Sequence, residues 1–183
     1  MIQNIRKTLL AVALFGAVAA PTASFASDGT INFSGMLTDN TCKPSVNGTG
    51  KDGQVNLPTV SVDALAKKGD VTGDTHYQIK LSGCTGDLTN VAVYYEAGPT
   101  VDYETGNLVN ALGDATNVEV QLLNAADGGK IELGAVDAAS QNAAYMEIVG
   151  GEATLDYVAR YYALGPTGPG SVETSVTYSL IYK

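Results

Sequence analysis

Residues 172–182 read V-E-T-S-V-T-Y-S-L-I-Y, and this stretch decides the fold class. Alternate positions are apolar or aromatic over most of its length, at Val172, Val176, Tyr178, Leu180 and Tyr182. A period of two residues predicts a β-strand with one buried face. Only Lys183 follows in the sequence, and an exposed apolar strand edge invites pairing with another chain. We therefore expect this edge to be paired with a partner strand.

A second alternating stretch lies near the other end, where residues 29–35 read G-T-I-N-F-S-G. Gly29, Ile31 and Phe33 fall on one face, whereas polar side chains fall on the other. The pattern predicts a short strand with a small or apolar face. No flanking segment is available to cover it, so we expect both terminal strands to pair with other chains.

The first 26 residues predict a cleaved secretory signal peptide. Arg6 and Lys7 precede an uncharged apolar run over residues 9–20, which is too short to span a bilayer. Ser24 and Ala26 supply the small residues of a cleavage site. Cleavage after Ala26 leaves 183 − 26 = 157 residues, enough for one domain with a substantial core. The remaining sequence has no apolar run long enough for a membrane-spanning helix.

Composition favours an all-β domain and argues against several partners. Removing two cations with the signal peptide leaves a charge of (10 − 2) − 19 = −11. Nucleic acids and anionic membranes bind clustered positive charge, so both are poor partners for this chain. One of the 21 glycines, Gly16, lies in the signal, and 20/157 is about 13 %, against about 7 % in average proteins. Short β-rich runs separated by turn residues predict a β-sandwich.

Cys42 and Cys84 are the only cysteines in the sequence. An even number of cysteines in an exported chain predicts one disulfide, here across 84 − 42 = 42 positions. A metal site would need further ligands, and His76 is the only histidine. A redox function would favour a closely spaced C-x-x-C pair, which the sequence lacks. A structural disulfide is therefore the best interpretation.

The sequence offers little for catalysis. It contains no G-x-S-x-G, no H-E-x-x-H and no P-loop. Asp102 and Glu104 could form a carboxylate pair for acid–base chemistry, but their turn-like D-Y-E-T-G-N run is more simply a solvated loop. We expect no enzyme activity, no catalytic residues, no cofactor and no metal site.

Taken together, these features resemble the chaperone–usher fimbrial subunits of the type 1 pilin family. The likeness covers nearly all of residues 27–183 and rests on short motifs in order. They are G-T-I-N-F-S-G leading to Cys42, I-K-L-S-G-C ending at Cys84, A-T-N-V-E-V-Q-L-L at 115–123, A-R-Y-Y-A at 159–163, Gly170 as the fourteenth residue from the end, and the penultimate Tyr182. The stretches L-P-T-V-S-V-D-A-L at 57–65 and Y-Y-E-A-G at 94–98 look most like the serotype-determining fimbrial subunits of Bordetella.

The resemblance implies an all-β, incomplete immunoglobulin-like sandwich that lacks its last strand. It divides the chain into a signal peptide (1–26), an N-terminal donor-strand extension (27–35) and a pilin domain (36–183). The groove left by the absent strand would bind first a strand of a periplasmic chaperone and then the extension of the next subunit. In the family the disulfide links the first strand to the end of the third.

The resemblance also implies site residues and partners. Gly29, Ile31 and Phe33 would form the inserting face of the donor strand. The strand that binds the chaperone would comprise Gly170, Val172, Val176, Tyr178, Leu180, Tyr182 and Lys183, whose carboxylate could meet a basic cleft.

The implied function is that of a structural subunit of a surface fimbria that supports adhesion. Such a subunit passes through the periplasm and an outer-membrane usher, polymerises with other subunits and can meet a host surface. Two alternatives stay open at this point. One is a minor, adaptor or tip-associated adhesin subunit that binds a host ligand, and the other is a secreted hydrolase on a β-sandwich.

Overall fold

The computed structural model describes residues 29–183, which belong to two units. The first unit, Met1–Met36, is described from Gly29 onward, and its residues 29–36 are exposed and form no strand or helix. The predicted signal peptide (1–26) and the first two residues of the predicted extension lie outside the described residues. The second unit, Leu37–Lys183, contains the strands that follow.

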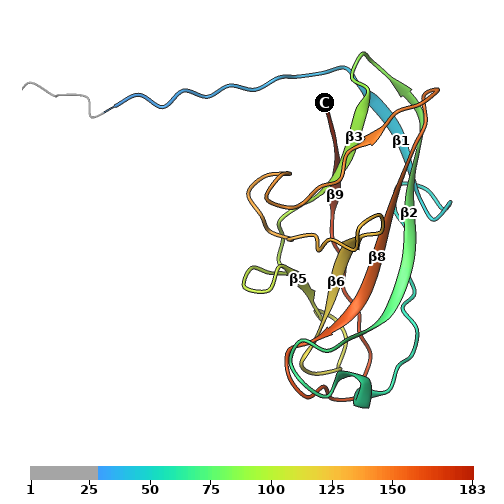
Figure 1. The fold of residues 1–183 in the computed structure, drawn as a ribbon, viewed down its shortest axis with the longest axis vertical. Helices are drawn as coiled ribbons and strands as arrows, with labels where there is room; N and C mark the ends of the chain where they lie inside the picture. Colours follow the sequence, from blue (N-terminus) through green and yellow to red (C-terminus); the bar gives the residue numbers. More distant parts are fainter. Residues whose placement is uncertain (1–28) are drawn as a thin grey trace, which may run out of the picture. The chain divides into compact units, whose positions relative to one another are not determined.

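The unit Leu37–Lys183 is all-β, as the sequence predicts (Figure 1). One 3-10 turn, η1 (Val62–Leu65), begins after Ser61, whose hydroxyl accepts a hydrogen bond from Asp63 N. The strands are β1 (Thr41–Val46), β2 (Val71–Thr85), β3 (Asn90–Tyr95), β4 (Val101–Asp102), β5 (Asn107–Val109), β6 (Val118–Asn124), β7 (Met146–Glu147), β8 (Ala153–Ala163) and β9 (Tyr178–Tyr182).

The strands form two antiparallel sheets. One sheet has the order β1-β2-β8-β6-β5-β4, and the other has the order β7-β3-β9. Figure 1 shows the long strands β2 and β8 side by side, and their register places Tyr77 opposite Tyr157 and Ile79 opposite Leu155. This register is set by apolar side chains that alternate along both strands and share one face.

A single main core contains side chains from both sheets. Ile79 and Leu155 from the first sheet are buried in the same cluster as Val91 and Val93 from the second. Two sheets that share a core make a β-sandwich, so the predicted fold class is confirmed. Partly buried side chains of the C-terminal segment, including Val176, pack against this cluster.

Two predicted strands differ from what the structure contains. Within residues 172–182, only β9 belongs to a sheet, although exposure alternates through residues 171–180 as the period of two predicts. Residues 55–60 read V-N-L-P-T-V and predict a further strand, but they form none, and Pro58 there has no N–H to donate to a ladder. Because residues 55–60 are not a strand, Cys84 lies at the end of the second strand and not of the third.

Candidate functional site: an open groove beside the C-terminal segment

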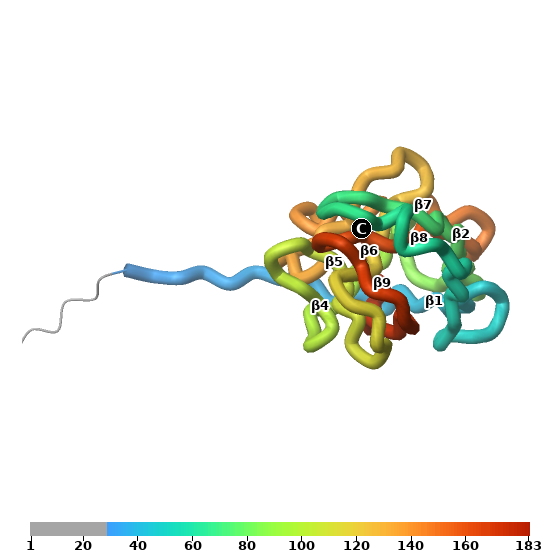
Figure 2. The backbone as a smooth tube through the Cα atoms, turned by 90° about the horizontal axis from the view of Figure 1, so that it is seen from below, coloured from blue at the N-terminus to red at the C-terminus, as the bar shows by residue number. Residues whose placement is uncertain are grey.

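An open groove of about 1130 Å³ lies along the C-terminal end of the chain. Its C-terminal wall is formed by residues 172–180, and its opposite wall is formed by β1 and residues 51–57. Figure 2 shows β9 and β1 on the same side of this unit. The floor consists of apolar and aromatic side chains, namely Tyr77, Ile79, Tyr95, Leu108, Val120, Leu122 and Ala159.

Among residues 29–183, the backbone of the C-terminal wall is hydrogen-bonded to the rest of the chain along one edge only. Odd-numbered residues supply these bonds: Ser171 O accepts from Ala115 N, Glu173 O from Leu112 N, Ser175 O from the Thr100 hydroxyl and Thr177 O from Glu96 N. Successive residues of an extended strand direct their backbone groups to opposite edges.

The other edge of this wall faces the groove. The N–H and C=O groups of Val172, Thr174 and Val176 have no hydrogen-bond partner among residues 29–183. The hydroxyl of Thr174 is also buried without a partner there. Backbone groups in this situation cost free energy unless a partner strand or water pairs with them, so the edge is suited to accept a strand.

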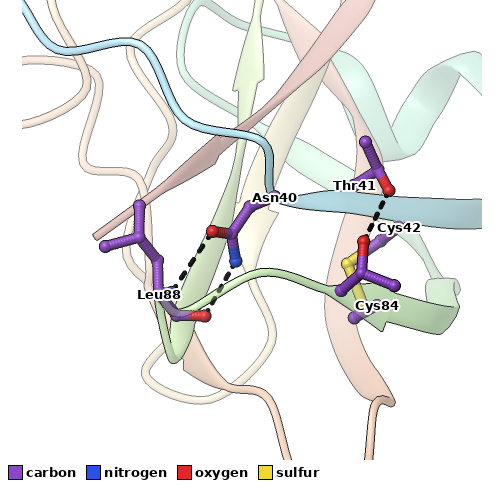
Figure 3. The surroundings of a disulfide bond; sticks show 6 residues. Asn40, Thr41, Cys42, Cys84 and Leu88 are labelled. Carbon is purple, nitrogen blue, oxygen red and sulfur yellow. Dashed lines mark hydrogen bonds between the residues drawn. A yellow bond between two sulfur atoms is a disulfide. The ribbon is translucent and has the colours of Figure 1, made fainter.

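The opposite wall is fixed to its sheet by the disulfide between Cys42 in β1 and Cys84 in β2. Next to it, the Asn40 side chain donates to Leu88 O at 2.9 Å and accepts from Leu88 N at 3.2 Å (Figure 3). Gly86 has a φ of +98°, and a Cβ atom there would lie 2.3 Å from Asn40 Oδ1. Only glycine therefore allows this close approach.

The opposite wall consists of β1 itself and of residues 51–57, which come after β1 in the sequence. Pro44 lies within β1 and has no N–H, which suits an edge strand.

Residues 48–53 have the spacing G-x-G-x-x-G of dinucleotide-binding loops. No helix follows them before the short turn η1, so the loop lacks the structural context of a phosphate site.

The start of the C-terminal wall is held by a cluster around Gly170. Gly170 has a φ of +155°, and a Cβ atom there would lie 2.5 Å from Ala115 N. The amide of Asn110 donates to Ser171 O at 3.0 Å and accepts from Glu173 N at 2.8 Å. The wall is thus fixed at its start by contacts that leave its groove edge open.

A pair of tyrosines supplies the polar atoms of the groove floor. The hydroxyls of Tyr77 and Tyr95 are 2.7 Å apart, so one donates to the other. Burial raises the pKa of both phenols, which therefore stay neutral. A floor of this kind favours an apolar-faced strand over a charged ligand.

The structure places the residues predicted for this site as follows. Val172, Val176, Tyr178 and Leu180 line the groove. Tyr182 is paired with Val91 in β3, and the Lys183 backbone exchanges hydrogen bonds with Asn90. In the first unit, Ile31 is 79 % exposed and Phe33 is 91 % exposed, so the apolar row predicted to insert elsewhere is accessible.

Within residues 29–183, no three His, Cys, Asp or Glu side chains gather in a way that could hold a metal ion. Over the same described range, no helix is sufficiently long and apolar to span a membrane.

Comparison with known proteins identifies the family. A family model described as FimA, type-1 fimbrial protein, A, matches residues 57–183. The major fimbrial subunit SMF-1 of Stenotrophomonas maltophilia is 45 % identical over 90 % of this chain and 98 % of its own. The serotype 2 fimbrial subunit of Bordetella pertussis is 35 % identical over 94 % of this chain and 96 % of its own. The Bordetella likeness is therefore confirmed, and the Stenotrophomonas protein is more similar still.

A solved structure shares the fold. The crystal structure of the P pilus rod subunit PapA matches 78 % of this chain and 99 % of its own with a TM-score of 0.56, at 17 % sequence identity. The two open sheet edges at the groove are those of an incomplete immunoglobulin-like pilin fold.

The chain belongs to the type-1 fimbrial protein family. It is a structural fimbrial subunit that polymerises with other subunits in a fimbria on the cell surface. Its relatives are structural subunits and not enzymes, and the comparisons do not favour the adaptor, adhesin or hydrolase alternatives.

Proposed function

We propose that the groove binds the donor strand of a neighbouring subunit, formed by Gly29, Ile31 and Phe33 within residues 27–35. The observation that carries this proposal is the unpaired backbone edge at Val172 and Thr174, which lies over an apolar floor. A strand added there would pair with that edge and bury its own apolar row, which is the mode of β-augmentation. The exposed side chains of Ile31 and Phe33 suit such an insertion.

Before polymerisation, a strand of a periplasmic chaperone occupies the same groove. The chaperone binds the row from Gly170 to Lys183, shields the apolar floor and delivers the subunit to an outer-membrane usher. Burial of apolar surface contributes about 25 cal/mol per Å², so an uncovered groove of this kind favours aggregation. The subunit therefore crosses the periplasm as a chaperone complex, and the assembled fimbria supports adhesion.

Deletion of residues 27–33 tests this proposal. The deleted segment completes the sandwich of another subunit, so the variant is expected to yield a soluble chaperone complex but no fibres by electron microscopy. A matched pair of point variants refines the test: Phe33→Ala removes an inserting side chain, whereas Asn32→Ala changes the opposite face. Phe33→Ala should reduce fibre yield far more than Asn32→Ala. Fibres of normal length from the deletion variant would overturn the proposal.

A further inference from the structure

Strand β3 lies in the middle of the three-stranded sheet, and one of its two edges faces β9. The backbone of Asn90 exchanges two hydrogen bonds with that of Lys183, at 3.0 and 2.9 Å. Backbone groups alternate between the two edges of a strand, so the even-numbered residues of β3 pair with β9. The odd-numbered residues direct their N–H and C=O groups to the other edge, and they are Val91, Val93 and Tyr95. We call this other edge the outer edge of β3.

A side chain pairs with the last residue of the outer edge. Gln141 Oε1 accepts a 2.7 Å hydrogen bond from Tyr95 N, and Gln141 Nε2 donates a 2.8 Å hydrogen bond to Tyr95 O. The Gln141 side chain is completely buried. A residue of a neighbouring antiparallel strand would exchange the same two hydrogen bonds with Tyr95. The Gln141 amide therefore occupies the place that an added strand would need.

Two further contacts cover the rest of the outer edge. Strand β7 pairs with β3 and places Met146 opposite Val91, but β7 is only two residues long. Beyond it, the Tyr157 hydroxyl contacts the backbone of Val93. Among residues 29–183, the part of the outer edge from Val93 to Tyr95 is therefore covered by side chains and not by a strand.

Gln141 belongs to a short turn that is held beside β3. Asp137 Oδ1 accepts from Ser140 N at 2.7 Å, and Asp137 O accepts from Gln141 N at 2.9 Å. A little earlier in the chain, Ala135 O accepts a 2.7 Å hydrogen bond from the hydroxyl of Tyr94, a residue of β3. These contacts fix the Gln141 amide in front of the edge before any other chain approaches, so that little conformational entropy is lost there.

We propose that the outer edge of β3 is a strand-addition site for a second copy of this chain, and that Gln141 keeps it closed. A strand edge with unpaired backbone groups readily pairs with another chain, and proteins cover such edges to prevent this. Other copies of the chain are the strands at highest local concentration, because the subunit polymerises. Two copies related by a two-fold axis at Val93 would pair antiparallel, with Val91 of each opposite Tyr95 of the other.

Gln141→Leu in the full-length subunit, purified as its chaperone complex, tests this proposal. Leucine keeps much of the side-chain volume but leaves the N–H and C=O groups of Tyr95 unpaired. The variant should form about tenfold or more multimer than wild type by size exclusion with light scattering, since two hydrogen bonds that compete with an added strand are lost. The Tyr95 amide should exchange faster than wild type in the monomeric fraction and should be protected again in the multimers.

Asn107→Ala is the matched control for lost stability. It removes a buried 3.0 Å hydrogen bond to Glu119 in the other sheet and leaves the outer edge covered, so it should not form multimers. Gln141→Glu is the second variant in case Gln141→Leu does not fold. It keeps the acceptor for Tyr95 N but replaces the donor to Tyr95 O with a carboxylate oxygen, and it should form multimers to a smaller extent.

Deletion of residues 27–33 separates this proposal from the donor-strand proposal. The multimers of the Gln141 variants should persist in the deletion background, because they form between two β3 edges. Variants that fold but stay monomeric, multimers in which the Tyr95 amide still exchanges fast, or equal multimer formation by Asn107→Ala would each overturn the closing function of Gln141. Normal fibres from the deletion variant with wild-type Gln141 would instead overturn the proposed function alone.

Discussion

The six-stranded sheet has two faces that satisfy their polar groups in different ways. Along β6, Val120 and Leu122 face the groove, whereas Glu119 and Gln121 face the opposite side. On that opposite side, Arg160 donates two hydrogen bonds to Gln121, which donates to Asn107. Asn107 in turn donates to Glu119 Oε2 at 3.0 Å, and both residues are only 1 % exposed. We call these four residues the polar network.

The difference between these two faces shows that the fold is incomplete beside the groove and not on the opposite side of the sheet. In the polar network, side chains of one chain bond to each other across β8, β6 and β5, although one oxygen of Glu119 has no hydrogen-bond partner among the described residues. Beside the groove, the backbone groups of Val172, Thr174 and Val176 have no hydrogen-bond partner among residues 29–183 and are available to pair with a second chain. Changes at the groove should therefore act on chaperone binding and assembly, whereas changes in the network should act on stability alone.

We expect the largest effect from Cys84→Ser, because it removes the disulfide that fixes the groove's opposite wall. Opening a disulfide across 42 positions costs about 4 kcal/mol, a large fraction of the stability of a small domain. No chaperone-bound subunit should then be recovered from the periplasm by pull-down and immunoblotting. Purified wild-type fibres should show no free thiols after denaturation. A normal yield of the Cys84→Ser complex would contradict this account of the wall.

A second change acts on the C-terminal wall itself, through Leu180→Ala combined with Tyr182→Ala. Truncating two half-buried apolar side chains should cost about 2–4 kcal/mol and remove part of the surface proposed to bind the chaperone. The subunit should be degraded in the periplasm and should not co-purify with its chaperone. Ser179→Ala, on the outward face of the same strand, is the control and should behave as wild type. Co-purification of the double variant at wild-type yield would exclude this wall as the chaperone site.

A change in the polar network should separate stability from assembly. Asn107→Ala removes the hydrogen bonds to Glu119 and Gln121 and leaves buried polar groups without partners. The expected loss is about 1–3 kcal/mol, measured as a lower urea midpoint. Fibres should still form, because the groove is unchanged. Among residues 29–183, the Asn90 side chain bonds only to the neighbouring Thr89 hydroxyl, so Asn90→Ala should change the midpoint little. Loss of fibres at normal subunit levels would show that the two faces are coupled.

The smallest effect concerns the pH dependence of the network. Burial raises the pKa of Glu119, and the adjacent Asp102 carboxyl raises it further. A carboxyl with a raised pKa stabilises the fold below its ordinary pKa, and this contribution is lost as the pH rises through the raised value. The pKa of Asp102 is lowered, chiefly by a hydrogen bond from the Glu104 backbone, so its contribution is instead lost as the pH falls.

Glu119→Gln removes the titrating carboxyl of Glu119 and with it the contribution of that carboxyl to the pH dependence of stability. Relative to wild type, the variant should gain stability as the pH rises above the ordinary glutamate pKa of about 4, measured as the difference between urea midpoints. Glu104→Gln, at an exposed position nearby, is the control. Equal pH dependence of wild type and Glu119→Gln would show that Glu119 titrates as an ordinary glutamate.

Local sequence patterns were sufficient to predict the all-β class and the alternating C-terminal row. They also led to the interpretation of Cys42 and Cys84 as a pair, and the structure contains this disulfide. The groove's opposite wall could not be predicted, because the sequence indicates a loop up to residue 53 and a strand from residue 55, whereas residues 51–57 form no strand and gain their position from tertiary contacts. The contact between Tyr178 and Lys51 joins residues 127 positions apart, beyond the reach of any local period. Asp102 was considered with Glu104, but its carboxyl instead contacts the buried Glu119 on a different strand.

Amide hydrogen exchange at the C-terminal wall tests the central claim most directly. The claim is that the N–H groups of Val172, Thr174 and Val176 are unpaired within one subunit and become paired in the fibre. In refolded, chaperone-free monomer, these three amides should exchange fast, while the amide of Glu173, bonded to Asn110 Oδ1, should be protected. In assembled fibres, all four should be protected. Protection of the three amides in the monomer, or their fast exchange in the fibre, would contradict the account.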